Sequence, residues 1–130
     1  MGLDIGDKRI GVSLSDPSGI LASPFTIIHR RDLESDIKSI KDILSLHQVE
    51  RVIVGLPISM NGRQHGQADK VRNFVEFLRE QIGIPLEYRD ERLSTRYVRR
   101  LMNMAGSKKS GYDAMAAAII LQGYLDEDVK

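Results

Sequence analysis

The sequence contains no cysteine and no tryptophan, and only 5% of its residues are aromatic. Without cysteine the chain can form neither a disulfide nor a thiolate-based zinc site, which fits a reducing compartment. Four tyrosines and three phenylalanines provide little for the stacking platforms that bind single-stranded bases. Any recognition of nucleic acid would therefore rest on backbone charge and shape.

Long hydrophobic runs are also missing from the sequence. No apolar stretch reaches the roughly 18 residues that a membrane span needs. The chain enters its first predicted strand almost at once, which leaves no room for a signal peptide. We therefore expect a cytoplasmic protein with no membrane partner. With 130 residues, of which 42% are hydrophobic and 28% charged, the chain suits a single domain over residues 1–130.

Charge is balanced over the whole chain but unevenly distributed along it. The formal net charge is +1, which by itself does not indicate a nucleic-acid partner. Between residues 92 and 109 there are six basic residues and no acidic one, namely Arg92, Arg96, Arg99, Arg100, Lys108 and Lys109. A local basic face is compatible with phosphate contact. A solvated helix face is the commoner origin of such a charge run.

The first part of the chain has the hydrophobic alternation of β-strands. Strands are predicted at Leu3–Gly6, Lys8–Ser15 and Phe25–His29. Gly6-Asp7 and the segment Asp16–Gly19 have the composition of tight turns between them. These features together predict an antiparallel meander.

The pattern then changes to helical periodicity alternating with buried strands. It first predicts a helix from Leu33 capped by Asp32, a strand at Val49–Leu56 and a polar loop at Pro57–Gly66. A helix over Val71–Ile82 and a strand at Pro85–Asp90 follow. The last predicted elements are a helix after Ser94-Thr95, a loop at Gly106–Gly111 and a helix from about Tyr112 to Leu125. This order predicts an α/β fold with a mixed five-stranded sheet, the meander plus two parallel strands, and helices on both faces. Ligands of such sheets bind at the carboxyl ends of the parallel strands.

Acidic residues lie where these elements begin, end or cross the sheet. Asp4 is on the first strand, Asp90-Glu91 closes the fifth, and Asp113 begins the last helix. Strands disfavour aspartate, and burying an unpaired carboxylate is costly. If the first and fifth strands are near neighbours, and the last helix starts over the same edge, these carboxylates converge. Converging oxygen ligands favour Mg²⁺ or Mn²⁺, and two ions about 3.5–4 Å apart could act on a phosphodiester.

Each acid also has a simpler explanation. Asp4 could cap the turn at Gly6, Glu91 could pair with a neighbouring arginine, and Asp113 could be an N-cap or first-turn acid. The spacing of the three acids is non-local and carries no short-range metal signature. Periodicity and spacing leave both interpretations in place.

Four sequence stretches carry a resemblance to a known family. They read DIGDKRIGVSLSD, VIVGLPISMNGRQ, YRDERLST and YDAMAAAIILQGYL. In this order, over nearly the whole chain, they resemble the YqgF (RuvX) family, which comprises Holliday-junction resolvases and, in bacteria, the nuclease that matures the 5′ end of pre-16S ribosomal RNA. The resemblance implies a ribonuclease H-like fold, with Asp4, Glu91 and Asp113 as catalytic and metal-binding residues. The family usually has serine after the last acid, where this chain has Ala114.

Basic residues close to these acids are candidate substrate-binding groups. Lys8 and Arg9 could hold a phosphate beside the first acid, or could be charges that protect a strand edge from aggregation. Arg92 could orient Glu91 or contact phosphate itself. The remaining candidates lie in predicted loops and are Arg63, Lys108 and Lys109.

The favoured hypothesis is a metal-dependent endonuclease that hydrolyses phosphodiester bonds in structured nucleic acid. Precursor ribosomal RNA is the first expected substrate and a branched DNA junction the second. Junction resolution normally needs two active sites, so the hypothesis allows a monomer or a homodimer.

Two other classes of function compete with it. One is a nucleotide-binding module, because DIGDKRIGV also resembles the phosphate loop of actin-like ATPases, although 130 residues provide no second lobe to enclose a nucleotide. The other is a non-catalytic RNA-binding factor in ribosome assembly.

Overall fold

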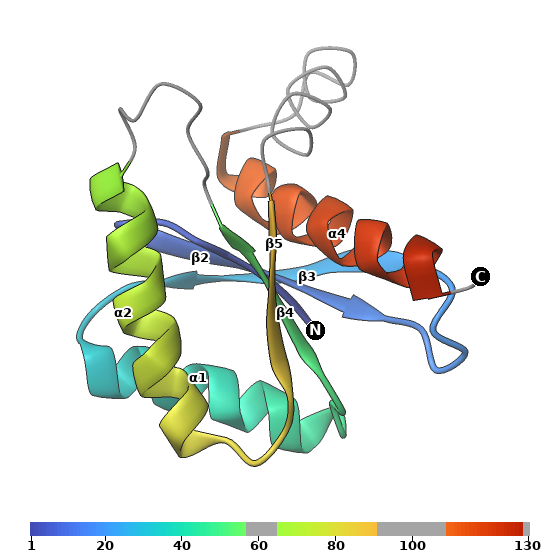
Figure 1. Ribbon diagram of the computed structural model, residues 1–130, viewed down its shortest axis with the longest axis horizontal. Coiled ribbons are helices and arrows are strands. Elements are labelled where there is room, and N and C mark those ends of the chain that lie inside the picture. The colour runs from blue at the N-terminus through green and yellow to red at the C-terminus, as the bar shows by residue number, and fades with distance from the viewer. Residues whose placement is uncertain (57–64, 91–108, 129–130) are drawn as a thin grey trace.

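The computed structural model describes residues 1–56, 65–90 and 109–128, whose arrangement Figure 1 shows. A five-stranded sheet has the order β3-β2-β1-β4-β5. Helices α1 and α2 cover one face of this sheet and α4 covers the other (Figure 1). The predicted mixed sheet with helices on both faces is confirmed.

The meander consists of β1 (Gly2–Ile5), β2 (Arg9–Ser15) and β3 (Ala22–His29), paired antiparallel as predicted. In the β1–β2 turn, the Gly6 amide donates to the Arg9 carbonyl at 2.9 Å. Strand β3 begins three residues before the predicted Phe25, because Ala22, Ser23 and Pro24 continue the pairing with β2 after a register shift that skips Phe25. Proline is tolerated there because β3 is an edge strand of the sheet.

The parallel part of the sheet is formed by β4 (Val52–Leu56) and β5 (Leu86–Asp90), with β4 also parallel to β1. Helix α1 (Leu33–Leu46) has the predicted N-cap, because the Asp32 carboxylate accepts from the Ser35 amide at 2.8 Å. Strand β4 begins later than predicted because the Val49 amide still closes the end of α1 through the Leu44 carbonyl. Helix α2 (His65–Gln81) begins within the predicted Pro57–Gly66 loop.

Helix α4 (Lys109–Asp128) starts earlier than the sequence pattern suggests. The loop predicted at Gly106–Gly111 is wrong for its last residues, since Lys109 is the first residue of the helix and Asp113 the fifth. Glycine and serine lower helix stability chiefly in the helix interior, so Ser110 and Gly111 are tolerated in the first turn. The helix predicted after Ser94-Thr95 lies outside the described residues.

The hydrophobic core has a layer on each side of the sheet. Leu3 and Ile5 of β1 pack with α1 and α2 residues such as Ile40 and Val75. On the other side, Ile53 of β4 packs against Ile120, Leu121 and Leu125 of α4. None of the helices in the described ranges has the length and hydropathy to cross a membrane.

Candidate active site

Asp4 faces the side of the sheet that α4 covers. Its neighbours Leu3 and Ile5 are buried in the core beneath α1 and α2, and alternation along the strand turns Asp4 the other way. Its register partner on β2 is Gly11. Paired residues of antiparallel strands share a face, with Cβ atoms about 4.5–5.5 Å apart. The half-buried Asp4 carboxylate therefore lies beside Gly11, on the α4 side.

The backbone of α4 rests directly on Gly11. A Cβ atom placed on this glycine would be 1.9 Å from the carbonyl oxygen of Asp113 and 2.8 Å from the amide nitrogen of Ala114. Only glycine can accept so close an approach. Asp4 and the backbone of Asp113 therefore both lie beside Gly11 on one face of the sheet, although they come from opposite ends of the chain.

Small residues extend this close contact along α4. Ser13 is buried, and its hydroxyl donates to the Ala117 carbonyl at 2.7 Å. A Cβ atom on Gly2 would be 2.6 Å from that same carbonyl oxygen. Ala114, which stands where the YqgF-like pattern usually has serine, is buried in the contact and leaves the adjacent Asp113 in place. The small residues of both elements thus determine how deeply α4 sits on the sheet.

Arg9 has a role that sequence reasoning missed. Its Nε donates to Asp113 Oδ2 at 2.7 Å, with 34% and 23% of the two side chains exposed. The roles expected for Arg9 from the sequence are phosphate contact and strand-edge protection, and neither includes this ion pair. The sequence signal for this role is the position of Arg9 two residues before Gly11. Because side chains alternate along a strand, Arg9 and Gly11 face the same covering helix. An exposed ion pair is worth roughly 0–1 kcal/mol, so its main effect is to orient the Asp113 carboxylate.

The simpler explanations for Asp4 and Asp113 can be compared with this geometry. Asp113 is the fifth residue of α4, so its interpretation as an N-cap or first-turn acid is wrong. The amide of Gly6, which Asp4 was suggested to cap, donates to the carbonyl of Arg9. Asp113 is therefore not explained as a helix cap, and the Gly6 amide has a backbone acceptor within the turn.

The fifth strand is not adjacent to the first. Strand β4 lies between them, which puts their axes about 10 Å apart. Asp90 ends β5 opposite Leu56, the last residue of β4. Figure 1 shows both strands ending at the edge of the sheet where α2 and α4 begin. Glu91 and Arg92 follow directly but lie outside the described residues, as do Arg63 and Lys108.

The carboxylates of Asp4 and Asp113 are the kind of ligand that a hard divalent cation prefers. Mg²⁺ is commonly held by one or two carboxylates while it keeps several waters. Asp4 and Asp113 supply half-buried oxygen ligands on one face of the sheet. Within residues 1–56, 65–90 and 109–128, no group of three or more acidic, histidine or cysteine side chains is close enough to hold a metal. A third ligand would have to come from elsewhere in the chain.

Lys8 is the other described candidate for substrate binding. It is exposed in the turn that joins β1 to β2, next to Arg9. Its carbonyl accepts a hydrogen bond from the backbone amide of Arg30 at 2.9 Å. The side chain of Lys8 thus extends from a turn whose main chain is anchored.

Comparison with known proteins is consistent with this arrangement. The sequence profile described as "RuvX: Holliday junction resolvase" matches residues 1–127. A protein of Desulforamulus reducens, provisionally named a pre-16S rRNA nuclease, is 46% identical over 134 residues, covering 100% of this chain and 98% of its own length. A relative from Caldanaerobacter subterraneus with the same provisional name is 45% identical over 131 residues, covering 97% of this chain and 94% of its own.

Solved structures share the fold at low sequence identity. The RuvC protein of T. thermophilus in complex with a Holliday junction substrate superposes with a TM-score of 0.64 and 16% identity, over 98% of this chain and 94% of that one. The fowlpox virus resolvase with its junction DNA gives a TM-score of 0.55 and 11% identity, over 99% and 97% of the two chains. The ribonuclease H-like fold predicted from the sequence is confirmed. By the match of its sequence over residues 1–127, this chain belongs to the RuvX Holliday junction resolvase family.

Proposed function

We propose that this protein is a metal-dependent nuclease that hydrolyses phosphodiester bonds in structured nucleic acid, and that its substrate is the 5′ region of pre-16S ribosomal RNA. The observation that carries the proposal is that Asp4 and Asp113 both lie beside Gly11 on one face of the sheet. The provisional names of relatives at about 45% identity favour ribosomal RNA as the substrate. Such a function would be carried out in the cytoplasm.

Each residue in the proposal has a distinct task. Asp4, Glu91 and Asp113 would hold Mg²⁺ or Mn²⁺, most simply as two ions. The bound metal supplies an activated water and stabilises the leaving oxygen. Arg9 orients the Asp113 carboxylate through their ion pair. Phosphates of the substrate would be contacted by the basic residues that the sequence offers as candidates, namely Lys8, Arg63, Arg92, Lys108 and Lys109.

The decisive experiment is cleavage of a labelled RNA that carries the 5′ extension of 16S ribosomal RNA. Wild type should cleave this RNA with Mn²⁺ and not with a chelator. Asp113→Asn should lower the cleavage rate by about 100-fold or more, since even the outer partners of metal sites commonly contribute 10–100-fold. Asp42→Asn is the matched control, because Asp42 is exposed and forms an ion pair with Lys38 on α1, which covers the face of the sheet opposite α4. Full activity of Asp113→Asn in Mn²⁺ would remove this residue from the site.

The second candidate is resolution of four-way DNA junctions. The description of the family and the fold shared with junction-bound resolvases favour it. The same assay should therefore include a synthetic four-way junction, and sedimentation should establish whether the protein is a monomer or a homodimer. Cleavage of the junction by a dimer, without cleavage of the RNA, would reverse the order of the two substrates.

A further inference from the structure

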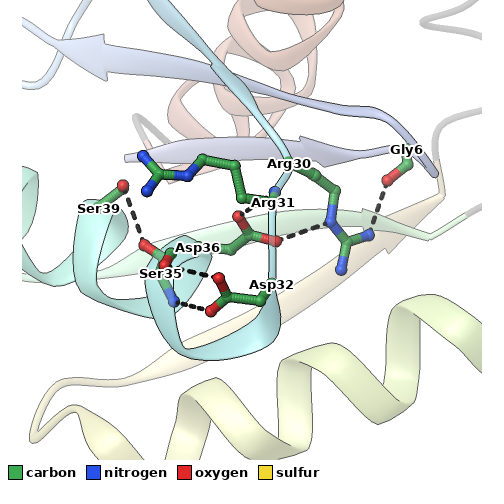
Figure 2. Close-up of polar contacts among 7 residues, drawn as sticks. All are labelled: Gly6, Arg30, Arg31, Asp32, Ser35, Asp36 and Ser39. Carbon is green, nitrogen blue, oxygen red and sulfur yellow. Dashed lines mark hydrogen bonds and ion pairs between the residues drawn. The ribbon is translucent and has the colours of Figure 1, made fainter.

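The turn between β1 and β2, residues 6–8, is fixed by a residue from outside the hairpin. Arg30 lies between β3 and α1, and its Nη1 donates to the carbonyl of Gly6 at 2.8 Å. The backbone amide of Arg30 also donates to the carbonyl of Lys8 at 2.9 Å. Figure 2 shows the Arg30 guanidinium reaching across to Gly6. One residue therefore holds both sides of the turn, directly after the strand that carries Asp4.

Arg30 is itself held by a buried carboxylate. Its Nε donates to Asp36 Oδ2 at 3.1 Å, and Asp36 is only 2% exposed. The other oxygen of Asp36 accepts from the backbone amide of Arg31 at 3.0 Å, as Figure 2 also shows. The Arg30 guanidinium lies over the ring of Phe74 on α2, 4.9 Å from its centroid. A carboxylate is buried so deeply only where it is paired and hydrogen-bonded, so this arrangement is specific.

The geometry of Arg30 separates it from the phosphate-binding candidates. Its Nε and Nη1 are engaged by Asp36 and Gly6, and one face of the guanidinium is covered by Phe74. Lys8, by contrast, is exposed at the turn that Arg30 holds. A group on a fixed turn loses less conformational entropy when it binds a ligand than the same group on a mobile turn.

We propose that Arg30, held by Asp36, is a positioning residue that fixes the β1–β2 turn so that Lys8 is presented to a phosphate of the nucleic acid. The planar guanidinium is needed because it donates to Asp36 and to the Gly6 carbonyl at the same time. Lysine carries its three donors on one nitrogen, which cannot occupy the positions of Nε and Nη1 at the same time. The part of this inference that concerns phosphate rests on the proposed nuclease function, whereas the fixing of the turn does not.

The first test measures the turn itself by amide hydrogen exchange. Arg30→Lys and Arg30→Met should accelerate exchange of the Gly6 amide about tenfold, as expected from loss of one charge-assisted hydrogen bond, relative to the buried Val12. Arg31→Gln is the matched control, because Arg31 is exposed and contacts Asp36 through its backbone amide. Arg30→Met leaves the buried Asp36 without its cation, so Arg30→Lys decides the outcome if Arg30→Met does not fold. Unchanged exchange at Gly6 in Arg30→Lys would overturn the proposal.

The second test measures binding and turnover with the 5′-extended RNA. Arg30→Lys should raise KM several-fold with a smaller change in kcat, and Arg31→Gln should change neither. If Arg30 affects RNA binding through Lys8, the double variant Arg30→Lys/Lys8→Met should have nearly the same KM as Lys8→Met alone. Full RNA binding by Arg30→Lys, or independent addition of the two defects, would show that Arg30 does not act through the turn. Wild type could neither bind nor cleave the RNA while Arg30→Lys still accelerates exchange of the Gly6 amide. This result would refute the proposed nuclease function but would still support the role of Arg30 in fixing the turn.

Discussion

At the scale of single residues, Asp4 is the exception to the strand pattern, and the structure gives a physical reason for it. The residue lies beside Gly11 on the face where α4 brings Asp113. A hydrophobic side chain at this position would lie on the same face as the ion pair of Arg9 and Asp113. A polar side chain suits this face better, although the other residues of the strand are buried.

Arginines close to the same turn have two different tasks. Arg9 extends along β2 to Asp113, whereas Arg30 reaches the turn from the other side of the hairpin and holds its backbone. From the sequence, phosphate contact and strand-edge protection are both expected roles for Arg9, and nothing predicts that Arg30 fixes the turn. Their tasks depend on the partners that the fold supplies, and residue type alone does not specify those partners.

Asp32 permits a residue-scale prediction of pH dependence. Hydrogen bonds from the amide and hydroxyl of Ser35 lower the pKa of Asp32 from its ordinary value of 3.8. Because the folded pKa is the lower one, this cap stabilises the protein fully above pH 3.8 and is lost as the pH falls through the folded pKa. Asp32→Ala should therefore lower the Tm at about pH 6 and have little effect at about pH 2.

Thermal unfolding followed by circular dichroism over this pH range checks the Asp32 prediction. Glu50→Ala is a suitable control, since Glu50 is an exposed acid in the connection between α1 and β4. A Tm difference between wild type and Asp32→Ala that stays constant from pH 6 to pH 2 would mean that the ionised cap is not its cause.

At the scale of elements, the contact between α4 and β2 is the arrangement on which the site depends. Gly2, Gly11 and Ser13 form the surface of the sheet that accepts the alanine-rich part of α4. The start of α4 can lie this close to β2 only because residue 11 is glycine, since the Cβ atom of any other residue would clash with the backbone of Asp113. The proposed site therefore depends on the glycine in GVSLS as well as on the acids.

Gly11→Ala should accordingly destabilise the protein by about 3 kcal/mol or more, because overpacking against backbone atoms has little room to relax. The matched control is Gly66→Ala in α2, where an added Cβ meets no atom within 4 Å. That change should be neutral or stabilise by up to about 1 kcal/mol, since alanine is the better helix former. Urea unfolding of the three proteins gives both values. Equal stability of Gly11→Ala and wild type would contradict the close packing of α4 on β2.

Boundaries of elements were harder to predict than their existence. The meander, the N-cap at Asp32 and the parallel strands β4 and β5 are confirmed because short-range alternation and turn composition determine them. The early starts of β3 and α4 were missed because pairing with β2 and packing on the sheet extend both elements into residues with weak local preference.

At the scale of the whole molecule, metal binding should be coupled to stability. A metal that binds only the folded state stabilises it by about 2.7 kcal/mol at 100 times its dissociation constant. For a chain of this size, that corresponds to a rise in Tm of roughly 5–10 °C or somewhat more. Mn²⁺ should therefore raise the Tm of wild type and of Asp42→Asn, and a chelator should reverse the rise. Asp4→Asn and Asp113→Asn should respond much less.

Differential scanning calorimetry with and without Mn²⁺ makes this comparison without any nuclease substrate. The two aspartate variants should be folded before metal is added, which circular dichroism establishes. An equal Mn²⁺-induced rise in all four proteins would place the metal away from Asp4 and Asp113, whatever the cleavage assays show.

The amino-acid sequence by itself determined the α/β order, the antiparallel meander, the cap of α1 and, through its resemblance to the YqgF (RuvX) family, a short set of acids. These are local features or recurring motifs. Only the tertiary structure decided that Asp4 and Asp113 share one face, that Arg9 orients Asp113 and that Arg30 and Asp36 fix the turn. These depend on strand register and on the depth at which a distant helix packs, and both are set by contacts between segments that local preference cannot specify.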